Sequence, residues 1–193
     1  MGRVVVKKLH VRPSYALTRR PGFSPFPGAY DRPGCFLGGR GVLVEPTERA
    51  ELIVVGYAVR TSNADEKDPA RAKLPALWHR AGAPGAFAHV PNRVDEHLYA
   101  VLTDYESDHN GAFTQIVGTG VRTVPRLPEG MVAVRVPAGP ALRLEARGPM
   151  PQALAETWQR VWNHTESGGT PARAFTTDLE VHHPGGVDLY VAV

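Results

Sequence analysis

Two halves of the chain share three short motifs that occur in the same order. The matched segments are residues 56–60 and 139–143, residues 74–80 and 154–160, and residues 103–106 and 177–180. The spacing between matched segments shrinks slowly along the chain, as expected when a duplication is followed by changes in loop length. The chain is therefore predicted to fold as two copies of one module, at about 48–125 and 130–193.

Each predicted copy has the order strand, helix, strand, strand. In the first copy, periodicity and turn signals place strands at 52–61, 97–106 and 113–124 and a helix starting near Leu74. In the second copy, strands at 131–137 and 140–146 flank a turn, and a helix to about Asn163 and strands at 174–182 and 187–193 follow. We predict an α+β fold: an antiparallel sheet with one long helix per half, pseudo-twofold symmetry and a central cleft.

The first 45 residues differ in composition from the rest of the chain. They contain five Pro, seven Gly and eight Lys or Arg against two acidic residues, a net charge of +6. The remainder has 14 basic and 17 acidic residues, a net charge of −3. We therefore predict a Pro/Gly-rich basic extension at 1–45 and a folded, mildly acidic domain at 46–193.

The repeat places aromatic or apolar residues beside carboxylates. Its matched pairs are Trp78 with Trp158, Tyr105 with Leu179, and Glu106 with Glu180. An aromatic wall with one carboxylate suits a lipophilic cation, because ring faces and a partly desolvated carboxylate both attract positive charge. The tryptophans can instead belong to the core, and Glu106 can simply be solvated. Glu180 is the stronger candidate, because an unpartnered carboxylate buried in a strand is costly.

Several of these segments resemble a known superfamily. Residues 74–78, 98–113, 150–162, 178–181 and 187–191 are similar to the effector-binding domains of gyrase-inhibitor-like proteins. Within that superfamily they most resemble the stand-alone integron-associated effector-binding proteins, which are related to the ligand domains of AraC-type and multidrug-responsive regulators. The resemblance covers about residues 48–193. It implies a duplicated fold whose central cleft takes small, often cationic and aromatic compounds.

The resemblance also implies roles for individual residues. A glutamate in the late strand of the second half typically meets the cation, and Glu180 stands at the matching position. Aromatic cleft residues carry over onto Tyr99, Tyr105 and Trp158. Residues 1–45 match nothing in the family pattern and contain no recognisable helix-turn-helix motif, so direct DNA binding is not expected.

Two classes of function stay open at this stage. The first is a small-molecule binding protein that senses or sequesters a drug or metabolite. The alternative is a hydrolase of strained, cyclopropane-bearing electrophiles, which the resemblance suggests for the same cleft. In that case Glu180 orients or deprotonates a water molecule, while Tyr105 donates a hydrogen bond to the developing oxyanion.

Other classes of protein find little support. The sequence has no nucleophile elbow, no phosphate-binding loop and no dinucleotide fingerprint, so no cofactor is expected. His182 and His183 are adjacent and would point to opposite faces of a strand, so no metal site is expected. A topoisomerase or other protein partner is conceivable but unsupported. The lone Cys35 and the lack of a secretion signal or a membrane-spanning run favour the cytoplasm, with no membrane partner.

Overall fold

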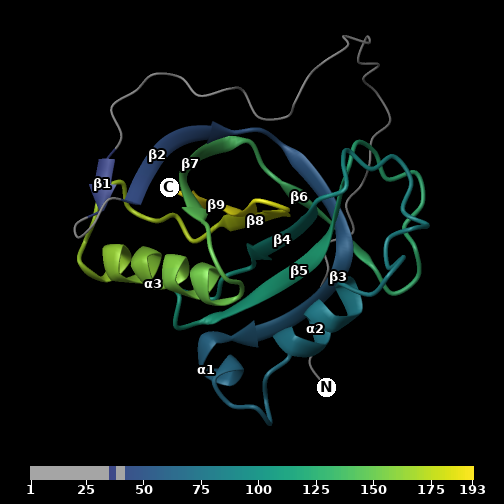
Figure 1. Cartoon of the computed structure of the whole chain (residues 1–193), viewed down its shortest axis with the longest axis horizontal. Helices are drawn as coiled ribbons and strands as arrows, with labels where there is room; N and C mark the ends of the chain where they lie inside the picture. The colour runs from purple at the N-terminus through teal and green to yellow at the C-terminus, as the bar shows by residue number, and fades with distance from the viewer. Residues whose placement is uncertain (1–34, 38–41) are drawn as a thin grey trace.

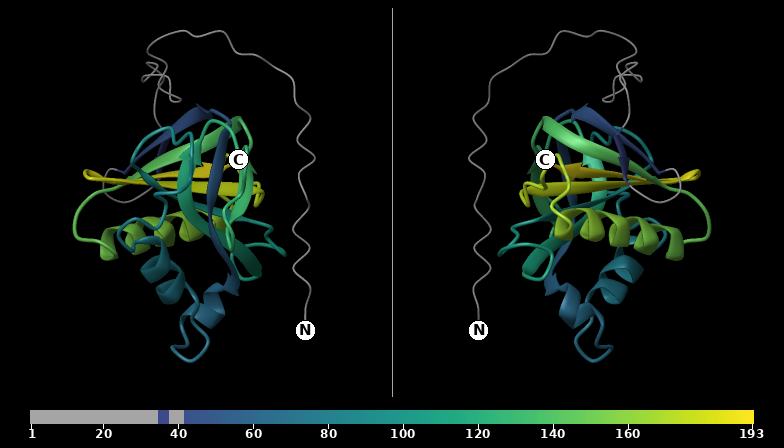
Figure 2. Two further views of the ribbon diagram at one scale, coloured as in Figure 1. Left: turned by 90° about the vertical axis from the view of Figure 1, so that its right-hand side faces the viewer. Right: turned by 90° about the vertical axis from the view of Figure 1, so that its left-hand side faces the viewer.

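The computed structural model describes residues 35–37 and 42–193. Within this part of the chain, nine strands form one curled sheet in the order β1-β2-β7-β9-β8-β4-β5-β3-β6. Every pairing in it is antiparallel. Helices α2 and α3 lie on the same side of the sheet, and the strands curl around the other side (Figures 1 and 2). The predicted α+β class is confirmed.

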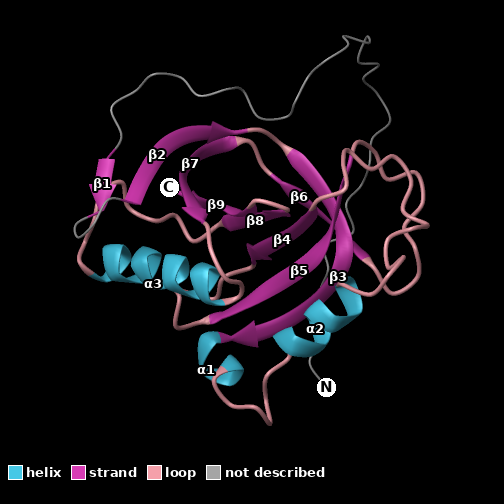
Figure 3. Ribbon diagram, viewed as in Figure 1, coloured by secondary structure: helices cyan, strands magenta, loops and turns pink. Residues whose placement is uncertain are grey.

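The described elements are nine strands and three helices, of which α3 is the longest (Figure 3). The strands are β1 (Cys35–Leu37), β2 (Val42–Arg49), β3 (Leu52–Ser62), β4 (Leu98–Thr103), β5 (Ala112–Val121), β6 (Val132–Val136), β7 (Gly139–Ala146), β8 (Thr177–His183) and β9 (Gly186–Ala192). The helices are α1 (Asn63–Glu66), α2 (Leu74–Ala81) and α3 (Gln152–Glu166).

The strand order is that of two copies of one module. The central six strands read β7-β9-β8 and then β4-β5-β3, so each half contributes its three strands in mirrored order, and β4 pairs with β8 at the junction. The predicted strands on either side of the turn at Ala138 and Gly139 do not pair with each other. Instead β6 pairs with β3 of the first half, and β2 pairs with β7 of the second. The two halves therefore exchange one strand each: β6 of the second half pairs with the first half, and β2 pairs with the second half.

Strand pairing also fixes which positions of the two halves are equivalent. Arg49 ends β2 as Val136 ends β6, and the strand that follows starts three residues later in both halves. Carrying this correspondence across the sheet makes Tyr99 equivalent to Leu179, and Ala100 equivalent to Glu180. Ala100 and Glu180 are also direct cross-strand partners, so the pseudo-twofold axis passes through this pair.

The equivalence differs from the one that the sequence motifs suggested. Glu106 is not the counterpart of Glu180, and Tyr105 is not the counterpart of Leu179. The short motif at 103–106 matched 177–180 by residue type, at an offset of 74 residues. The strand pairing instead gives an offset of 80 residues, because Ala100 is equivalent to Glu180. The prediction of two copies of one module is therefore confirmed. The alignment of the late strands between the two copies became clear only from the strand pairing.

The two helices differ in length, although one long helix per half was predicted. In α3, residues at helical spacing such as Leu154, Trp158 and Val161 face the sheet. By contrast, α2 spans only eight residues. Gly82 follows as its C-cap, with its N–H bonded to the Trp78 carbonyl at 2.8 Å, and Pro84 then prevents the helix from continuing.

The described part of the sheet begins before residue 46, the predicted start of the domain. Strand β1 and the first four residues of β2 belong to the segment assigned to the extension, and β2 pairs with β7 over residues 45–49. The rest of the predicted extension, residues 1–34 and 38–41, lies outside the described residues.

Candidate functional site

A cavity of about 520 Å³ lies on the helix side of the sheet, between α2, α3 and strands β4, β5 and β8. Its walls are mainly apolar and aromatic. The lining includes Trp78, Tyr105, Trp158, Trp162, Glu180 and His182. Among the described residues that line the cavity, Glu180 is the only carboxylate. Because Glu180 lies on the pseudo-twofold axis, this carboxylate is located between the two halves of the sheet.

Hydrogen bonds hold the Glu180 carboxylate from two sides. The residue is only 3% exposed. Trp158 Nε1 donates to Oε1 at 2.7 Å, and His182 Nε2 lies 2.8 Å from Oε2. The His182 ring in turn packs on Trp78 of α2, with 4.7 Å between ring centroids. Donors at both oxygens are what a buried ionised carboxylate requires, so the site can keep a negative charge in an apolar cavity.

Stacked rings form the wall on the α3 side. Trp158 and Trp162 stack with 6.4 Å between centroids, and His109 stacks on Trp162 at 6.0 Å. His109 Nε2 also lies 3.0 Å from Glu166 Oε1, near the end of α3. Phe113 and Tyr105 continue the wall, with their centroids 5.9 Å apart. These rings offer extended π faces to any group that enters the cavity.

A second buried network borders the cavity beside Glu180. Tyr105 donates its hydroxyl hydrogen to Asp178 Oδ2 at 2.6 Å, and Arg173 Nη2 donates to the Tyr105 oxygen at 3.0 Å. Arg173 also pairs with Asp178, and both side chains are almost completely buried. Burial, followed by the charge of Asp178, raises the pKa of the Tyr105 hydroxyl well above its ordinary value. Tyr105 therefore remains protonated at neutral pH.

The hydrogen bond to Asp178 bears on the catalytic role predicted for Tyr105. A tyrosine hydroxyl has one hydrogen to donate, and Asp178 already accepts it. Donation to a developing oxyanion, as the hydrolase alternative requires, would break this bond and leave a buried carboxylate with one partner fewer. The geometry thus gives the predicted catalytic pair of Glu180 and Tyr105 no ready proton donor.

The structure brings four of the six predicted ligand-binding residues to the cavity. Trp78, Tyr105, Trp158 and Glu180 all line it. Tyr99 does not: it alternates with Ala100 on β4 and so points to the opposite face, where its hydroxyl donates to Asp95 Oδ2 at 2.7 Å.

Glu106 also lies away from the lining. It is exposed in the β4–β5 connection, and its Oε2 accepts the backbone N–H of Ala112 at 3.1 Å. The carboxylate therefore supports the hairpin. Both corrections have simple causes: strand alternation removes Tyr99 from the cavity, and the early end of β4 at Thr103 leaves Glu106 in a turn.

Sequence reasoning missed three polar residues of the site: His182, Asp178 and Arg173. The first two could have been found, because they lie two residues on either side of Glu180 and must share its face of β8. Arg173 lies in the irregular segment between α3 and β8, where no periodicity indicates the direction of a side chain.

The adjacent histidines point to opposite faces, as strand alternation predicts. His182 meets Glu180 in the cavity, whereas His183 Nε2 lies 3.4 Å from Asp188 Oδ1 on the other face. Within the described ranges, no group of three or more His, Cys, Asp or Glu side chains is arranged to hold a metal ion. Over the same residues, no helix has the length and apolar character needed to cross a bilayer.

Comparisons with known proteins agree with this architecture. A family described as integron-associated effector binding protein matches residues 47–193. The crystal structure of the integron cassette protein VCH_CASS2 from Vibrio cholerae has a TM-score of 0.64 and 34% identity, over 78% of this chain and 95% of that one. YobU of Bacillus subtilis (strain 168), named as a candidate transcriptional regulator, is 29% identical over 147 residues, which is 72% of this chain and 89% of YobU.

A more distant structure shares the fold. SAV2435, solved bound to tetraphenylphosphonium, has a TM-score of 0.59 at 14% identity, over 77% of this chain and 91% of that one. At this identity the similarity concerns the fold alone.

Proposed function

Because the chain belongs to the family of integron-associated effector-binding proteins, we propose that it binds a lipophilic organic cation in the cavity between α2 and α3. Effector binding, the function in the family's description, is the binding of a small molecule. The observation that carries the finer proposal is the buried Glu180 carboxylate, the single acid among the described residues of an otherwise aromatic and apolar lining.

The chemistry of the lining favours a cation over a neutral ligand. Aromatic faces attract positive charge by about 0.5–2 kcal/mol per contact, more when water is excluded. A carboxylate in such surroundings adds a charge-assisted contact, which is stronger than one between neutral groups. The volume of about 520 Å³ suits a drug-sized molecule. That SAV2435 was solved with tetraphenylphosphonium supports the choice of this class of ligand and supplies a probe.

Such a protein acts as a sensor or as a sink for its ligand. In the described part of the chain the helices are α1, α2 and α3, and α2 and α3 enclose the cavity. They are thus committed to ligand binding, and we assign no direct contact with DNA to these residues. The proposed output is sequestration of the cation or a change passed to a protein partner.

Tryptophan fluorescence tests this proposal. Trp78, Trp158 and Trp162 line the cavity, so tetraphenylphosphonium should quench their emission saturably. Glu180→Gln keeps the shape of the side chain and removes its charge, and it should weaken binding by about tenfold or more. Glu106→Gln removes an exposed acid outside the cavity and should leave the affinity unchanged.

A ligand of opposite charge provides the second control. Tetraphenylborate has nearly the same shape as tetraphenylphosphonium but carries a negative charge, so it should bind much more weakly. Equal affinity for the two ions, or equal affinity of the wild type and a folded Glu180→Gln variant for the phosphonium, would refute cation binding at this acid. Circular dichroism establishes that the variant is folded.

A further inference from the structure

His182 lies beside the Glu180 carboxylate, where a bound cation would also be attracted. Its Nε2 lies 2.8 Å from Glu180 Oε2, both side chains line the cavity, and the ring is held from the other side by Trp78. The histidine side chain is 22% exposed, whereas that of Glu180 is 4% exposed. A proton from solvent can therefore reach the histidine while the carboxylate stays buried.

We propose that His182 is an internal competitor for Glu180, so that protonation of His182 and binding of an organic cation oppose each other. This inference rests on the proposed function. When His182 is protonated, it forms an ion pair with Glu180 and cancels the negative charge that attracts the ligand. When it is neutral, its ring still donates a hydrogen bond to Glu180, and the carboxylate keeps its charge. Acidification is then expected to release the cation.

The elements packed against His182 place uncharged residues beside it, so that Glu180 is its charged partner. On neighbouring strands its cross-strand partners are Leu98 and Val187, which carry no charge. From α2 the Trp78 ring packs on it, while the guanidinium of Arg80 on the same helix lies over the ring of Tyr57, 3.7 Å from its centroid. The remaining basic residue of α2, His79, needs a control of its own.

Among the described lining residues, three other groups are titratable. Tyr105 stays protonated because burial and Asp178 raise its pKa, so it does not change charge near neutral pH. Arg173 is neutralised by its ion pair with Asp178. His109 Nε2 faces Glu166, and its ring stacks on Trp162. Of the groups named here, His182 is the one bonded to Glu180.

Linkage fixes the direction and the size of the effect. Histidine is the side chain whose charge ordinarily changes between pH 5 and 8. If one proton competes with one cation, Kd rises as the pH falls, by at most about tenfold per pH unit. Reciprocity requires that binding of the cation expels a proton, up to one per ligand. A purely structural His182 would produce neither effect.

The experiment measures the Kd of tetraphenylphosphonium between pH 5.5 and pH 8 for the full chain. The wild type should bind on the order of tenfold more weakly at pH 5.5 than at pH 8. His182→Gln keeps a hydrogen-bond donor for Glu180 but cannot change charge, so its affinity should vary less than about twofold over the range. The matched control is His183→Gln, the next residue on the same strand with its side chain on the opposite face, and it should behave as the wild type.

Two further controls, His109→Gln and His79→Gln, should also keep the wild-type pH profile. Calorimetry near pH 6.5 in buffers of different ionisation enthalpy counts the protons released per cation, and release should be present in the wild type and absent in His182→Gln. Because the wild-type count needs no variant, the proposal remains testable even if a variant fails to fold.

The outcomes separate this inference from the proposed function. Absence of phosphonium binding at every pH would overturn the proposed function. Binding with no proton release, or a pH profile that persists in His182→Gln, would overturn the role of His182 and leave cation binding intact.

Discussion

The indole Nε1 of Trp158 on α3 donates a 2.7 Å hydrogen bond to Oε1 of Glu180 on β8. This bond ties the longest described helix to the central strand through a buried carboxylate, so the acid of the cavity is also part of the packing of α3. The same carboxylate oxygen therefore contributes to the packing of α3 and to the proposed binding site.

Replacing Trp158 with Phe should reveal the structural part of that bond. The change leaves Oε1 of Glu180 without its buried donor, which costs about 1–3 kcal/mol in the free energy of unfolding, in addition to the lost volume. Trp162→Phe makes the same chemical change at a partly buried neighbour on α3. Urea denaturation should show a clearly larger loss for Trp158→Phe; equal losses would mean that the bond contributes nothing.

Removing one partner from the buried ion pair of Arg173 with Asp178 should cost more than removing one partner from a surface pair. Both side chains are at most 3% exposed. Arg173→Met leaves the Asp178 carboxylate buried without its cation, and we expect a loss of about 3–5 kcal/mol. Arg135→Met removes an exposed partner of Glu51 and should cost less than about 1 kcal/mol. Denaturant melts of the two variants measure the contrast, and a loss at Arg173 as small as that at Arg135 would contradict it.

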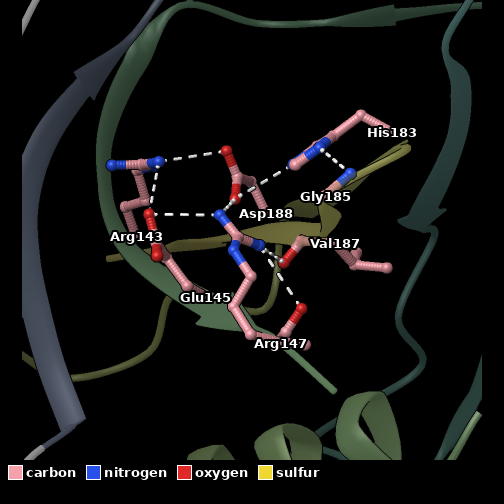
Figure 4. Close-up of polar contacts among 8 residues, drawn as sticks. Arg143, Glu145, Arg147, His183, Gly185, Val187 and Asp188 are labelled. Carbon is pink, nitrogen blue, oxygen red and sulfur yellow. Dashed lines mark hydrogen bonds and ion pairs between the residues drawn. The ribbon is translucent and has the colours of Figure 1, made fainter. Parts of the chain in front are cut away.

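Asp188 on β9 should make stability depend on acid pH. Figure 4 shows it among Arg143, Arg147 and His183, and Arg143 Nη2 donates to its Oδ2 at 3.0 Å. Burial acts to raise the pKa of Asp188, but hydrogen bonds from Arg147 and Arg143 outweigh it and hold that pKa below its ordinary value. The resulting stabilisation is complete above the unfolded pKa of about 4 and is lost as the pH falls through the lower folded-state pKa.

Asp188→Asn tests this sign. The difference in unfolding free energy between wild type and variant should be constant above about pH 5 and should shrink below about pH 4. Glu129→Gln, at an exposed site, supplies the control. A difference that does not change between pH 3 and pH 6 would show that Asp188 has the same affinity for protons in the folded and unfolded chain.

The close approach of β3 and β5 should make Gly118 sensitive to substitution. Gly118 is paired with Gly56, and a Cβ at Gly118 would overlap the Val55 carbonyl, which is backbone and cannot move aside. We expect Gly118→Ala to lower the free energy of unfolding by at least about 2 kcal/mol. At Gly120, on the same strand, a Cβ would meet side chains of Val94, Tyr99 and Leu52. Because side chains can shift, thermal melts should show a smaller loss for Gly120→Ala.

Much of this fold was readable from the sequence, because duplication and alternation are local patterns. The apolar stripe of α3 and the two sets of strands both follow from spacing. The exchange of β2 and β6 between the halves could not be predicted, because the residues of a strand do not indicate which other strand it pairs with.

The site was predicted in part for the same reason. Glu180 was assigned to the cleft because an unpartnered carboxylate buried in a strand is costly and because the family resemblance gives that position the ligand role. Trp158 was assigned from its place on the helix and from the same resemblance. Tyr99 was assigned by residue type and not by face, although its alternation with Ala100 determines the face. Arg173 could not be predicted, because its direction depends on the tertiary path of an irregular segment.

The pairing of Ala100 with Glu180 on the pseudo-twofold axis limits what a perfectly symmetric ancestor could have been. An acid at this position in both copies would set two carboxylates side by side on neighbouring strands, and like charges placed directly opposite are destabilising. An uncharged residue in one copy, here Ala100, avoids this repulsion beside the glutamate of the other copy. Because only one copy carries the glutamate, the two halves differ chemically at the centre of the sheet, and under the proposed function an asymmetric cation would meet a different half on each side.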